Sequence, residues 1–212
     1  MEEIKLDKAY WDSRYQSDNT RWDIGYVSPA IKNWFDFQEN KDLSILIPGA
    51  GSGYEVSYAH QLGFKKVFYM DISSEAINLF KSKNTSFPEN RILSTDFFDL
   101  HLSSCFDVII EQTFFCAQSP SKRVKYVNKT HDLLRKEGQI VGLLFAVNFQ
   151  KDGPPFGGDI TEYQKLFEQK YEINKLQICK TSIPEREGSE IWMELTKNCL
   201  LYTSPSPRDG LL

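Results

Sequence analysis

Short apolar runs of strand length alternate with helix-compatible segments along the chain. The runs that predict strands lie at residues 45–48, 68–71, 91–94, 106–110, 139–147, 171–181 and 189–195. Helices are predicted at residues 73–83, 121–134 and 160–168, with Ser73 or Ser74 as the cap of the first. Strands that alternate with helices are typical of an α/β domain, in which helices cover a mostly parallel sheet.

Further stretches of the chain refine this prediction. Residues 139–147 are apolar almost without interruption, which indicates a strand covered on both faces, and residues 136–138 predict a turn before it. The last two predicted strands are separated by the polar segment 183–188 and fit a hairpin. Near the N-terminus, residues 9–15 predict a short amphipathic helix and residues 20–25 a loop, and Pro29 after Ser28 suits the start of a second helix.

Three alternating glycines follow the first predicted strand. Gly49, Gly51 and Gly53 permit a sharp backbone turn and leave N–H groups free near a helix start, where a polar or anionic group is favoured. Such glycines are also common in turns that bind nothing. Asp71 favours the presence of a ligand. It ends the second strand, and its separation from the glycines is close to the ~20 residues at which a carboxylate contacts ribose hydroxyls.

The glycine spacing limits the kind of nucleoside. The chain has Gly-x-Gly-x-Gly rather than the Gly-x-Gly-x-x-Gly that brings a backbone close to a pyrophosphate. This difference argues against a dinucleotide. S-adenosylmethionine is therefore the leading candidate for the cofactor.

Polar residues also follow the next two strands. Asp96 and Phe97 form an acidic-aromatic pair that suits the adenine amino group and ring, and their position after the Asp71 strand favours this over a solvated turn. The strand at 106–110 delivers Glu111 and Gln112 to its carboxyl end, where open α/β sheets bind ligands. Glu111 is therefore a candidate active-site group. The loop at residues 151–158 is either a pocket wall or a simple connector.

Three aromatic residues lie close together near the N-terminus. Trp11, Tyr15 and Trp22 fit two interpretations: satellite core residues that seal one end of the sheet, or an aromatic lid over a cationic sulfonium. Their position in the sequence does not separate the two.

The composition favours a small-molecule substrate. The chain has 212 residues, 41% hydrophobic and 25% charged, with a net charge of −4 and no long basic run, which argues against a nucleic-acid or membrane-surface partner. The N-terminus lacks signal-peptide features and no apolar run is long enough to span a bilayer, so a cytoplasmic protein is expected, acting as a monomer. The four cysteines show no metal-ligand spacing, so neither a metal site nor a disulfide framework is predicted.

We interpret the C-terminal residues 199–209 as sequence that does not belong to the natural protein. They resemble, residue for residue, a reading frame of a transposase adapter used in sequencing libraries, although their Ser-Pro-rich composition would also suit a natural disordered tail. The sequence therefore predicts one folded domain at residues 1–198 and a disordered, adapter-derived tail at residues 199–212.

Several blocks together resemble the thiopurine S-methyltransferase superfamily, and within it the thiol and halide methyltransferase branch. The matching blocks cover nearly the whole domain, and their joint order is the evidence. They lie at residues 11–15, 22–25, 48–53, 71–73, 96–98, 106–109, 115–117 and 153–156.

The resemblance implies a single doubly wound, Rossmann-like, seven-stranded sheet of the class I methyltransferase type, with an antiparallel seventh strand and an N-terminal helical lid. It implies S-adenosylmethionine as cofactor, contacted by lid residues, by the glycine loop and by residues at strand ends. These expected cofactor-binding residues are Trp11, Tyr15, Trp22, Gly49, Gly51, Gly53, Asp71, Asp96, Phe97 and Gln112. The chain departs from the family pattern at Ala50, where a cysteine is usual, at Tyr15, where a tryptophan is common, and at Glu111–Gln112.

We therefore expect an S-adenosylmethionine-dependent methyltransferase that acts on a small soft nucleophile: a thiol, thiocyanate, a halide or a thiopurine-like acceptor. Two alternatives remain open. The first is a small-molecule O- or N-methyltransferase that uses Glu111 as a base, and the second is a non-catalytic module that binds S-adenosylmethionine. A complete aromatic lid favours turnover.

Overall fold

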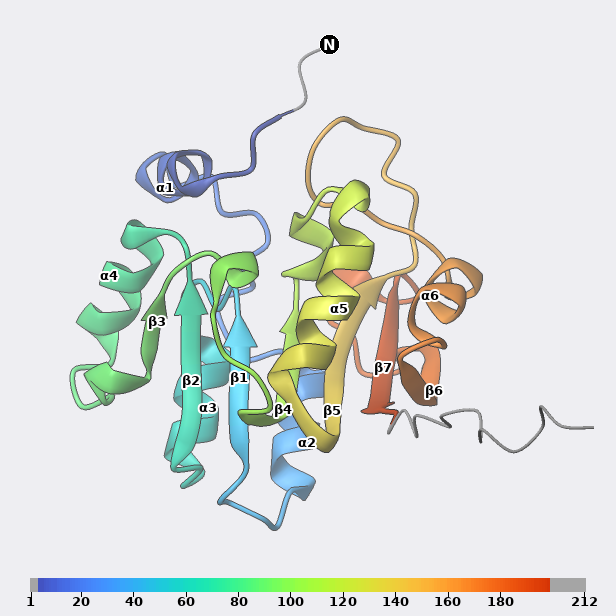
Figure 1. Cartoon of the computed structure of the whole chain (residues 1–212). Coiled ribbons are helices and arrows are strands. Elements are labelled where there is room, and N and C mark those ends of the chain that lie inside the picture. Colours follow the sequence, from blue (N-terminus) through green and yellow to red (C-terminus); the bar gives the residue numbers. More distant parts are fainter. Residues whose placement is uncertain (1–3, 199–212) are drawn as a thin grey trace, which may run out of the picture.

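A seven-stranded sheet with the strand order β3-β2-β1-β4-β5-β7-β6 forms the centre of the molecule (Figure 1). The computed structural model describes residues 4–198. Strand β7 runs antiparallel to both of its neighbours, β5 and β6, whereas β1 to β5 pair in parallel. The predicted doubly wound sheet with an antiparallel seventh strand is confirmed. The predicted tail at residues 199–212 lies outside the described residues.

The elements follow one another in the predicted alternation. The helices are α1 (Lys8–Gln16), α2 (Pro29–Phe37), α3 (Tyr54–Gln61), α4 (Ser74–Lys83), α5 (Arg123–Leu133) and α6 (Ile160–Phe167). The strands are β1 (Ser44–Pro48), β2 (Lys66–Asp71), β3 (Ile92–Ser94), β4 (Phe106–Gln112), β5 (Leu134–Phe145), β6 (Tyr171–Ile178) and β7 (Glu190–Lys197). Single 3-10 turns connect some of them, at residues 89–91, 97–99, 115–117, 120–122 and 184–186.

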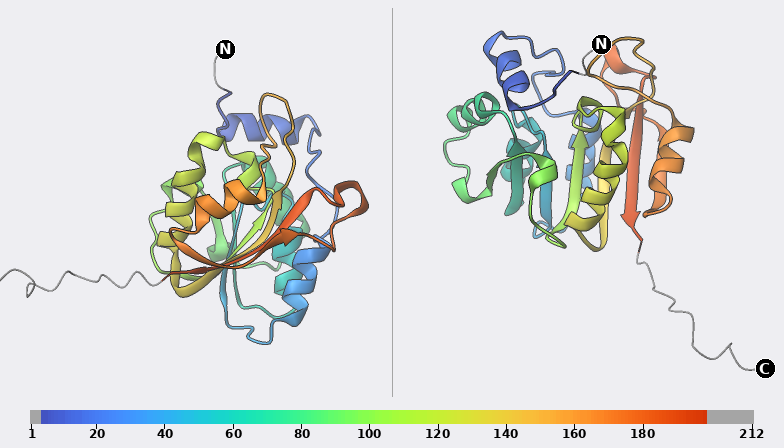
Figure 2. Two further views of the ribbon diagram at one scale, coloured as in Figure 1. Left: turned by 90° about the vertical axis from the view of Figure 1, so that its right-hand side faces the viewer. Right: turned by 45° about the horizontal axis from the view of Figure 1, so that its top comes forward.

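Side chains alternate between two hydrophobic cores, one on each face of the sheet. On β1, Ile45 and Ile47 pack with helices α2, α3 and α4, whereas Leu46 packs with α5 and α6. Figure 2 shows the two helical layers on opposite faces of the twisted sheet. Because both faces are covered, β1 is buried along its whole length, as expected for a parallel strand inside a doubly wound fold.

One predicted boundary is wrong. Residues 136–138 resemble a turn, but β5 begins directly after α5 at Leu134, and the extra residues form an irregularity in its pairing with β4. Phe106 pairs with Leu134 and Val108 with Gln139, so β4 holds both sides of the irregular segment in one sheet. Glu137 keeps a turn-like backbone, with a φ of 61°, but pairing with β4 on both sides places this turn inside β5 as an irregularity.

The C-terminal ends of the parallel strands meet at one edge of the sheet, and helix α1 lies above this edge (Figure 1). Asp7 caps α1 by accepting a hydrogen bond from Tyr10 N, and Ser73 caps α4 by accepting one from Ala76 N. Among residues 4–198, no helix is both long enough and apolar enough to cross a membrane.

Candidate active site

A cavity of about 690 Å³ opens at the C-terminal edge of the sheet. Its floor is formed by residues that follow β1, β2, β3 and β4, and its roof by helix α1 and residues 19–22. The loop after β5 and the hairpin between β6 and β7 close the other side. This is the edge at which open α/β sheets bind ligands.

Most of the residues predicted to bind the cofactor line this cavity. They come from four separate parts of the chain and meet only in the fold. The predicted residues in the cavity wall are Trp11, Tyr15, Trp22, Gly49, Asp71, Asp96 and Phe97.

The three glycines of the loop after β1 all have positive φ, between 55° and 72°, but they serve different contacts. A Cβ at Gly49 would lie 2.4 Å from a ring carbon of Phe114, and a Cβ at Gly51 would lie 2.8 Å from the Tyr15 hydroxyl. A Cβ at Gly53 would instead meet the buried ring of Phe80, 2.2 Å away. Gly51 and Gly53 lie behind the cavity wall and shape the loop, whereas Gly49 lines the cavity itself.

Asp71 is buried at the end of β2 and is already organised by the backbone. Its two carboxyl oxygens accept hydrogen bonds from Gly51 N at 2.9 Å and from Ser73 N at 2.8 Å. Burial raises the pKa of Asp71 to about 6, and these backbone N–H groups limit the rise. Each carboxylate oxygen has a second lone pair, so Asp71 retains the capacity to accept two more hydrogen bonds from the cavity side.

Asp96 and Phe97 lie at the end of β3, on the same side of the cavity as Asp71. The Asp96 carboxyl accepts a hydrogen bond from Phe98 N at 2.8 Å, which holds the turn that presents the Phe97 ring. Phe97 contacts Phe114 edge to face, with ring centroids 5.1 Å apart, and Phe114 in turn packs against Gly49. An apolar wall beside a carboxylate results.

The aromatic roof is joined to the body by polar contacts as well as by ring contacts. Trp22 packs edge to face against Trp11 and Tyr15, with centroid distances of 5.5 and 5.8 Å. The Trp22 carbonyl accepts a hydrogen bond from Arg186 at 2.9 Å, and the Ser52 hydroxyl donates to the Asp23 carboxylate. The three aromatic residues therefore form a lid over the cavity rather than a satellite core.

The expectation that Glu111 faces the pocket is wrong for this structure. Its side chain is fully buried and does not line the cavity. One carboxyl oxygen accepts hydrogen bonds from Phe114 N at 2.8 Å and Phe115 N at 2.7 Å, and the other accepts one from the Tyr126 hydroxyl at 2.7 Å. Burial raises the pKa of Glu111 to about 7. This carboxyl holds the turn after β4 and is not part of the cavity wall.

Gln112 is also absent from the cavity wall, although it was expected to contact the cofactor. Side chains of neighbouring strand residues point to opposite faces of a sheet, so Glu111 and Gln112 leave β4 in opposite directions. The residues that do reach the cavity are the next ones along the chain. Thr113, with a φ of 59°, and Phe114 line the wall.

Among the wall residues that the sequence analysis did not predict are Arg186 and Cys116. Arg186 lies in the β6–β7 hairpin loop, with 13% of its side chain exposed; it pairs with Glu190 at 3.4 Å and lies over the Phe145 ring, 5.6 Å from its centroid. Because β6 is parallel to β1, the loop after it must lie at the cavity edge, and this topology is the signal that locates Arg186. Cys116 is a free, buried thiol, and burial raises its pKa well above the ordinary value.

The loop at residues 151–158 forms part of the wall, through Lys151, Pro154 and Pro155. Two hydrogen bonds attach it to the body: Phe156 N donates to the Cys116 carbonyl at 2.6 Å, and Arg123 donates to the Gly157 carbonyl at 2.6 Å. The interpretation of this loop as a pocket wall is confirmed.

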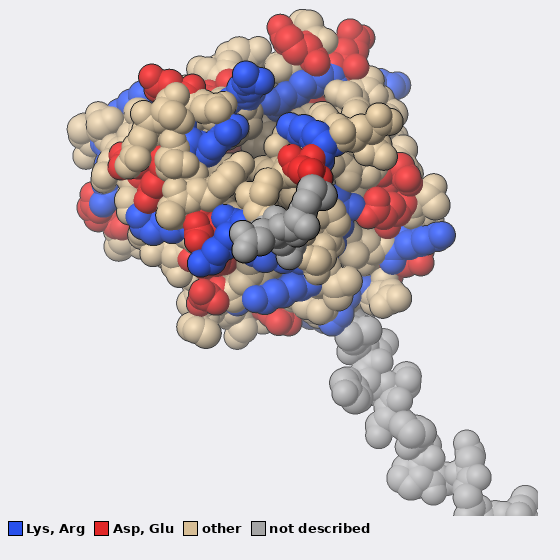
Figure 3. Space-filling model, turned by 90° about the horizontal axis from the view of Figure 1, so that it is seen from above, with Lys and Arg blue, Asp and Glu red and all other residues tan. Residues whose placement is uncertain are grey.

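The surface around the cavity carries both signs of charge. Seen from above, basic and acidic side chains are interspersed over this face (Figure 3). The cavity wall itself contains the cations Arg14, Arg21, Lys151 and Arg186 and the acids Asp71, Asp96 and Glu185. Within residues 4–198, no group of three or more His, Cys, Asp or Glu side chains is arranged to hold a metal ion.

Comparison with known proteins identifies related sequences over most of the chain. A family model described as thiopurine S-methyltransferase matches residues 6–200. A probable thiol methyltransferase 2 of Arabidopsis thaliana is 30% identical over 159 residues, which are 74% of this chain and 70% of the relative. Thiocyanate methyltransferase 1 of the same plant is 25% identical over 189 residues, which are 87% of this chain and 83% of the relative.

Solved structures share the fold at lower identity. A 1,6-didemethyltoxoflavin-N1-methyltransferase of Burkholderia thailandensis, with bound S-adenosylhomocysteine, superposes with a TM-score of 0.72 and 17% identity over 90% of this chain and 87% of that one. A magnesium protoporphyrin IX methyltransferase of Synechocystis, also with bound S-adenosylhomocysteine, has a TM-score of 0.69 and 14% identity over 90% and 97% of the two chains. At these identities the likeness shows the Rossmann-like fold alone.

Proposed function

The chain belongs to the thiopurine S-methyltransferase family, and from this premise we propose that it transfers the methyl group of S-adenosylmethionine to a small soft nucleophile. The acceptors we propose are thiols and the anions thiocyanate and iodide, with thiopurine-like compounds as a related class. The related plant proteins, a probable thiol methyltransferase and a thiocyanate methyltransferase, support sulfur acceptors for this chain as well.

The residues around the cavity fit the cofactor. Its volume of about 690 Å³ lies within the ~300–1,000 Å³ of small-molecule sites, and it leaves room for an acceptor beside a nucleoside. We propose that Asp71 accepts hydrogen bonds from the ribose hydroxyls, that Asp96 and Phe97 bind adenine, and that Gly49 lies against the methionine portion. A side chain at Gly49 would fill this space or displace Phe114, so the glycine keeps it open.

S-adenosylmethionine supplies a methyl group on a positively charged sulfur, which is a good leaving group. The protein then has to align the nucleophile with the methyl carbon and exclude water. In our proposal Trp11, Tyr15 and Trp22 perform both tasks from above, because their rings close the cavity and present aromatic faces to a cationic sulfur. Gly51 and Gly53 support this arrangement by shaping the loop below.

The observation that carries the proposed acceptor class is the chemistry of the wall opposite Asp71. This wall combines apolar side chains, such as Phe145 and Val147, with the largely buried guanidinium of Arg186. A fixed positive charge in an apolar surrounding favours a small anion or a thiolate over a neutral molecule, because Coulomb attraction is strong where water is scarce. Glu190 offsets part of this charge.

Cys116 is a nucleophile of the same kind within the wall, yet the protein keeps it unreactive. Its Sγ donates a hydrogen bond to the Thr113 carbonyl at 3.2 Å, and burial raises the pKa of its thiol. Since the thiolate is the reactive form, Cys116 stays protonated and does not compete with the acceptor.

Purified protein incubated with labelled S-adenosylmethionine and a panel of acceptors tests the proposal. We expect methylation of iodide, thiocyanate and small thiols, and little transfer to neutral alcohols or amines. Transfer to alcohols or amines alone would favour the base-assisted alternative, for which the exposed Glu185 in the cavity wall is better placed than Glu111. Binding of S-adenosylhomocysteine without transfer to any acceptor would favour the non-catalytic binding module.

A further inference from the structure

Helix α1 carries two of the three lid residues, yet the helix itself is weakly attached to the body. It has only nine residues, and none of them is buried. Helices this short are marginal on their own, and segments with few buried apolar contacts open at low free-energy cost. Polar contacts therefore take a large part in fixing where α1 lies.

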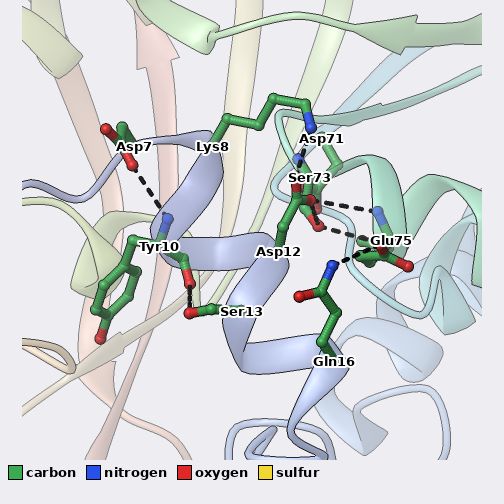
Figure 4. A network of polar contacts seen from close by, with 10 residues as sticks. Asp7, Lys8, Tyr10, Asp12, Ser13, Gln16, Asp71, Ser73 and Glu75 are labelled. Atoms are coloured by element: carbon green, nitrogen blue, oxygen red, sulfur yellow. Dashed lines mark hydrogen bonds and ion pairs between the residues drawn. The ribbon is translucent and has the colours of Figure 1, made fainter.

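A polar latch attaches α1 to the start of α4 (Figure 4). Asp12 Oδ1 accepts hydrogen bonds from the Ser73 hydroxyl at 2.7 Å and from Glu75 N at 3.3 Å. Gln16 Nε2 donates to Glu75 Oε1 at 2.9 Å one turn further along α1. Asp12 is the anion of this latch, placed at the positive end of a helix, where negative charge is stabilised.

Ser73 connects the latch directly to the cavity. It is fully buried, and its backbone N–H donates to the Asp71 carboxylate at 2.8 Å while its hydroxyl donates to Asp12. The same hydroxyl oxygen caps α4 by accepting from Ala76 N at 3.2 Å. One serine thus fixes the lid helix, the first turn of α4 and the proposed ribose-binding carboxylate relative to one another.

We propose that Asp12 is a positioning residue for the cofactor: through Ser73 it docks α1 in the closed position, so that lid closure and cofactor binding reinforce each other. The inference rests on the proposed function, because it takes Asp71 as the ribose contact. A closed lid places Trp11 and Tyr15 over the bound cofactor, and by thermodynamic reciprocity the bound cofactor must stabilise the closed lid to the same degree.

The state of Asp12 suits this role. Burial alone would raise the pKa of Asp12, but hydrogen bonds from Lys8 and Ser73 lower it overall, so the carboxylate stays ionised at neutral pH. Lys8 pairs with the other carboxyl oxygen at 2.5 Å from within α1 itself. This ion pair is not part of the latch, because it joins two residues of the same helix, and Lys8 therefore provides a matched control.

Three variants separate the latch from general effects on folding. Asp12→Ala removes the acceptor, Asp12→Asn keeps an acceptor for the Ser73 hydroxyl without the charge, and Lys8→Ala removes only the ion pair within α1. The dissociation constant of S-adenosylhomocysteine is measured by calorimetry, and lid opening by the rate of tryptic cleavage after Arg14, which lies on α1. Thermal melting of each variant reports on the fold.

We expect Asp12→Ala to raise the dissociation constant about tenfold and to accelerate cleavage after Arg14 by a similar factor, within the usual range of coupling between sites. Asp12→Asn should recover part of both effects, Lys8→Ala should behave as wild type, and the ligand should slow cleavage of the wild type more than that of Asp12→Ala. The latch would be overturned if Asp12→Ala bound the ligand and was cleaved at the wild-type rate. It would also be overturned if Asp12→Ala had a lower melting temperature and was cleaved throughout the domain. Failure of the wild type to bind S-adenosylhomocysteine would instead overturn the cofactor proposal, and cleavage after Arg14 in ligand-free protein would still decide on the latch.

Discussion

Asp71 and Glu111 are both buried carboxylates at the ends of strands that flank β1, yet their hydrogen bonds suit them to different tasks. Asp71 accepts two backbone hydrogen bonds and lines the cavity, which leaves lone pairs for a ligand. Glu111 accepts three hydrogen bonds from the protein and does not line the cavity. The direction of each side chain, rather than its chemical type, separates a ligand contact from a structural support.

Asp71 should make cofactor affinity depend on pH. We expect Asp71→Ala to weaken S-adenosylhomocysteine binding by about 1–3 kcal/mol, because the ribose hydroxyls lose a charge-assisted acceptor. In the wild type, affinity should fall as the pH drops below about 6, since protonation of Asp71 then removes the carboxylate. Calorimetry between pH 5 and 8 measures both effects. Asp71→Asn should lack this pH dependence, and Asp42→Asn, a variant at an exposed site, should retain it. An unchanged affinity in folded Asp71→Ala would contradict the proposed contact between Asp71 and the ribose.

Glu111 should make stability depend on pH. Its pKa is about 7 in the folded protein and near the ordinary 4.5 in the unfolded chain, so the folded state binds the proton more tightly. The contribution of Glu111 to the free energy of unfolding should therefore be largest below pH 4.5 and should fall as the pH rises to 7, by up to roughly 3 kcal/mol. Urea denaturation at several pH values should show this fall in the wild type and in the exposed control Glu172→Gln, but a flatter dependence in Glu111→Gln. Parallel curves for all three proteins would contradict the assignment.

At the scale of elements, local patterns were predictive where the physical cause is local. The unit formed by β1, the glycine loop, α3 and β2 follows from apolar runs, glycines and a terminal carboxylate that lie within 30 residues of each other. The Ser73 cap of α4 follows from hydrogen bonding within one turn. The irregular start of β5 was missed because β4, far away in the sequence, holds residues 134 and 139. Arg186 was missed for the same reason: a polar hairpin loop looks solvent-exposed until the sheet order places it beside Trp22.

Arg123 connects α5, α6 and the loop at residues 151–158. It pairs with Glu162, donates to the Gly157 carbonyl and lies over the Phe115 ring, and only 5% of the residue is exposed. Arg123→Met keeps the packing but releases the loop. We expect a loss of stability of about 1.5–3 kcal/mol and a raised KM for the acceptor, with little change in affinity for S-adenosylhomocysteine. The control Glu162→Gln keeps the contact between Arg123 and the loop. If Arg123→Met weakened the binding of cofactor and acceptor equally, the loop would not serve the acceptor alone.

At the scale of the whole molecule, the cavity is closed by segments from both ends of the described chain. Helix α1 and Trp22 come from the N-terminal part, and the hairpin that carries Arg186 comes from the C-terminal part. The hydrogen bond from Arg186 to the Trp22 carbonyl joins the two. Because β7 lies between β5 and β6, the C-terminal strands belong to the sheet and are required for this closure.

A chain that ends at Asn198 should retain the complete sheet, since β7 ends at Lys197 and Asn198 N still donates to the Lys170 carbonyl at 3.0 Å. We expect this shorter chain to keep the melting temperature and the affinity for S-adenosylhomocysteine of the 212-residue chain. A chain that ends at Ser189, before β7, is the control and should fail to fold. A drop of several degrees in the melting temperature of the first chain would show that residues beyond 198 belong to the domain.

The pH dependence of the reaction rate should reflect the charge of the acceptor. An acceptor that is already an anion carries no proton that a residue of the cavity must remove. A thiol with a pKa near ~8.5 is only a few per cent ionised at neutral pH, whereas thiocyanate and iodide are already anions. At saturating cofactor, between pH 6.5 and 9, we expect kcat/KM for a thiol to rise toward the pKa of that thiol and kcat/KM for thiocyanate or iodide to stay nearly flat. Glu111→Gln should keep both profiles, because the Glu111 carboxyl does not reach the cavity. If the anions are not methylated, and the methyl group is transferred to a neutral hydroxyl or amine instead, the soft-nucleophile proposal must give way to a base-assisted mechanism. Loss of that transfer in Glu185→Gln or in Glu111→Gln would then identify the base.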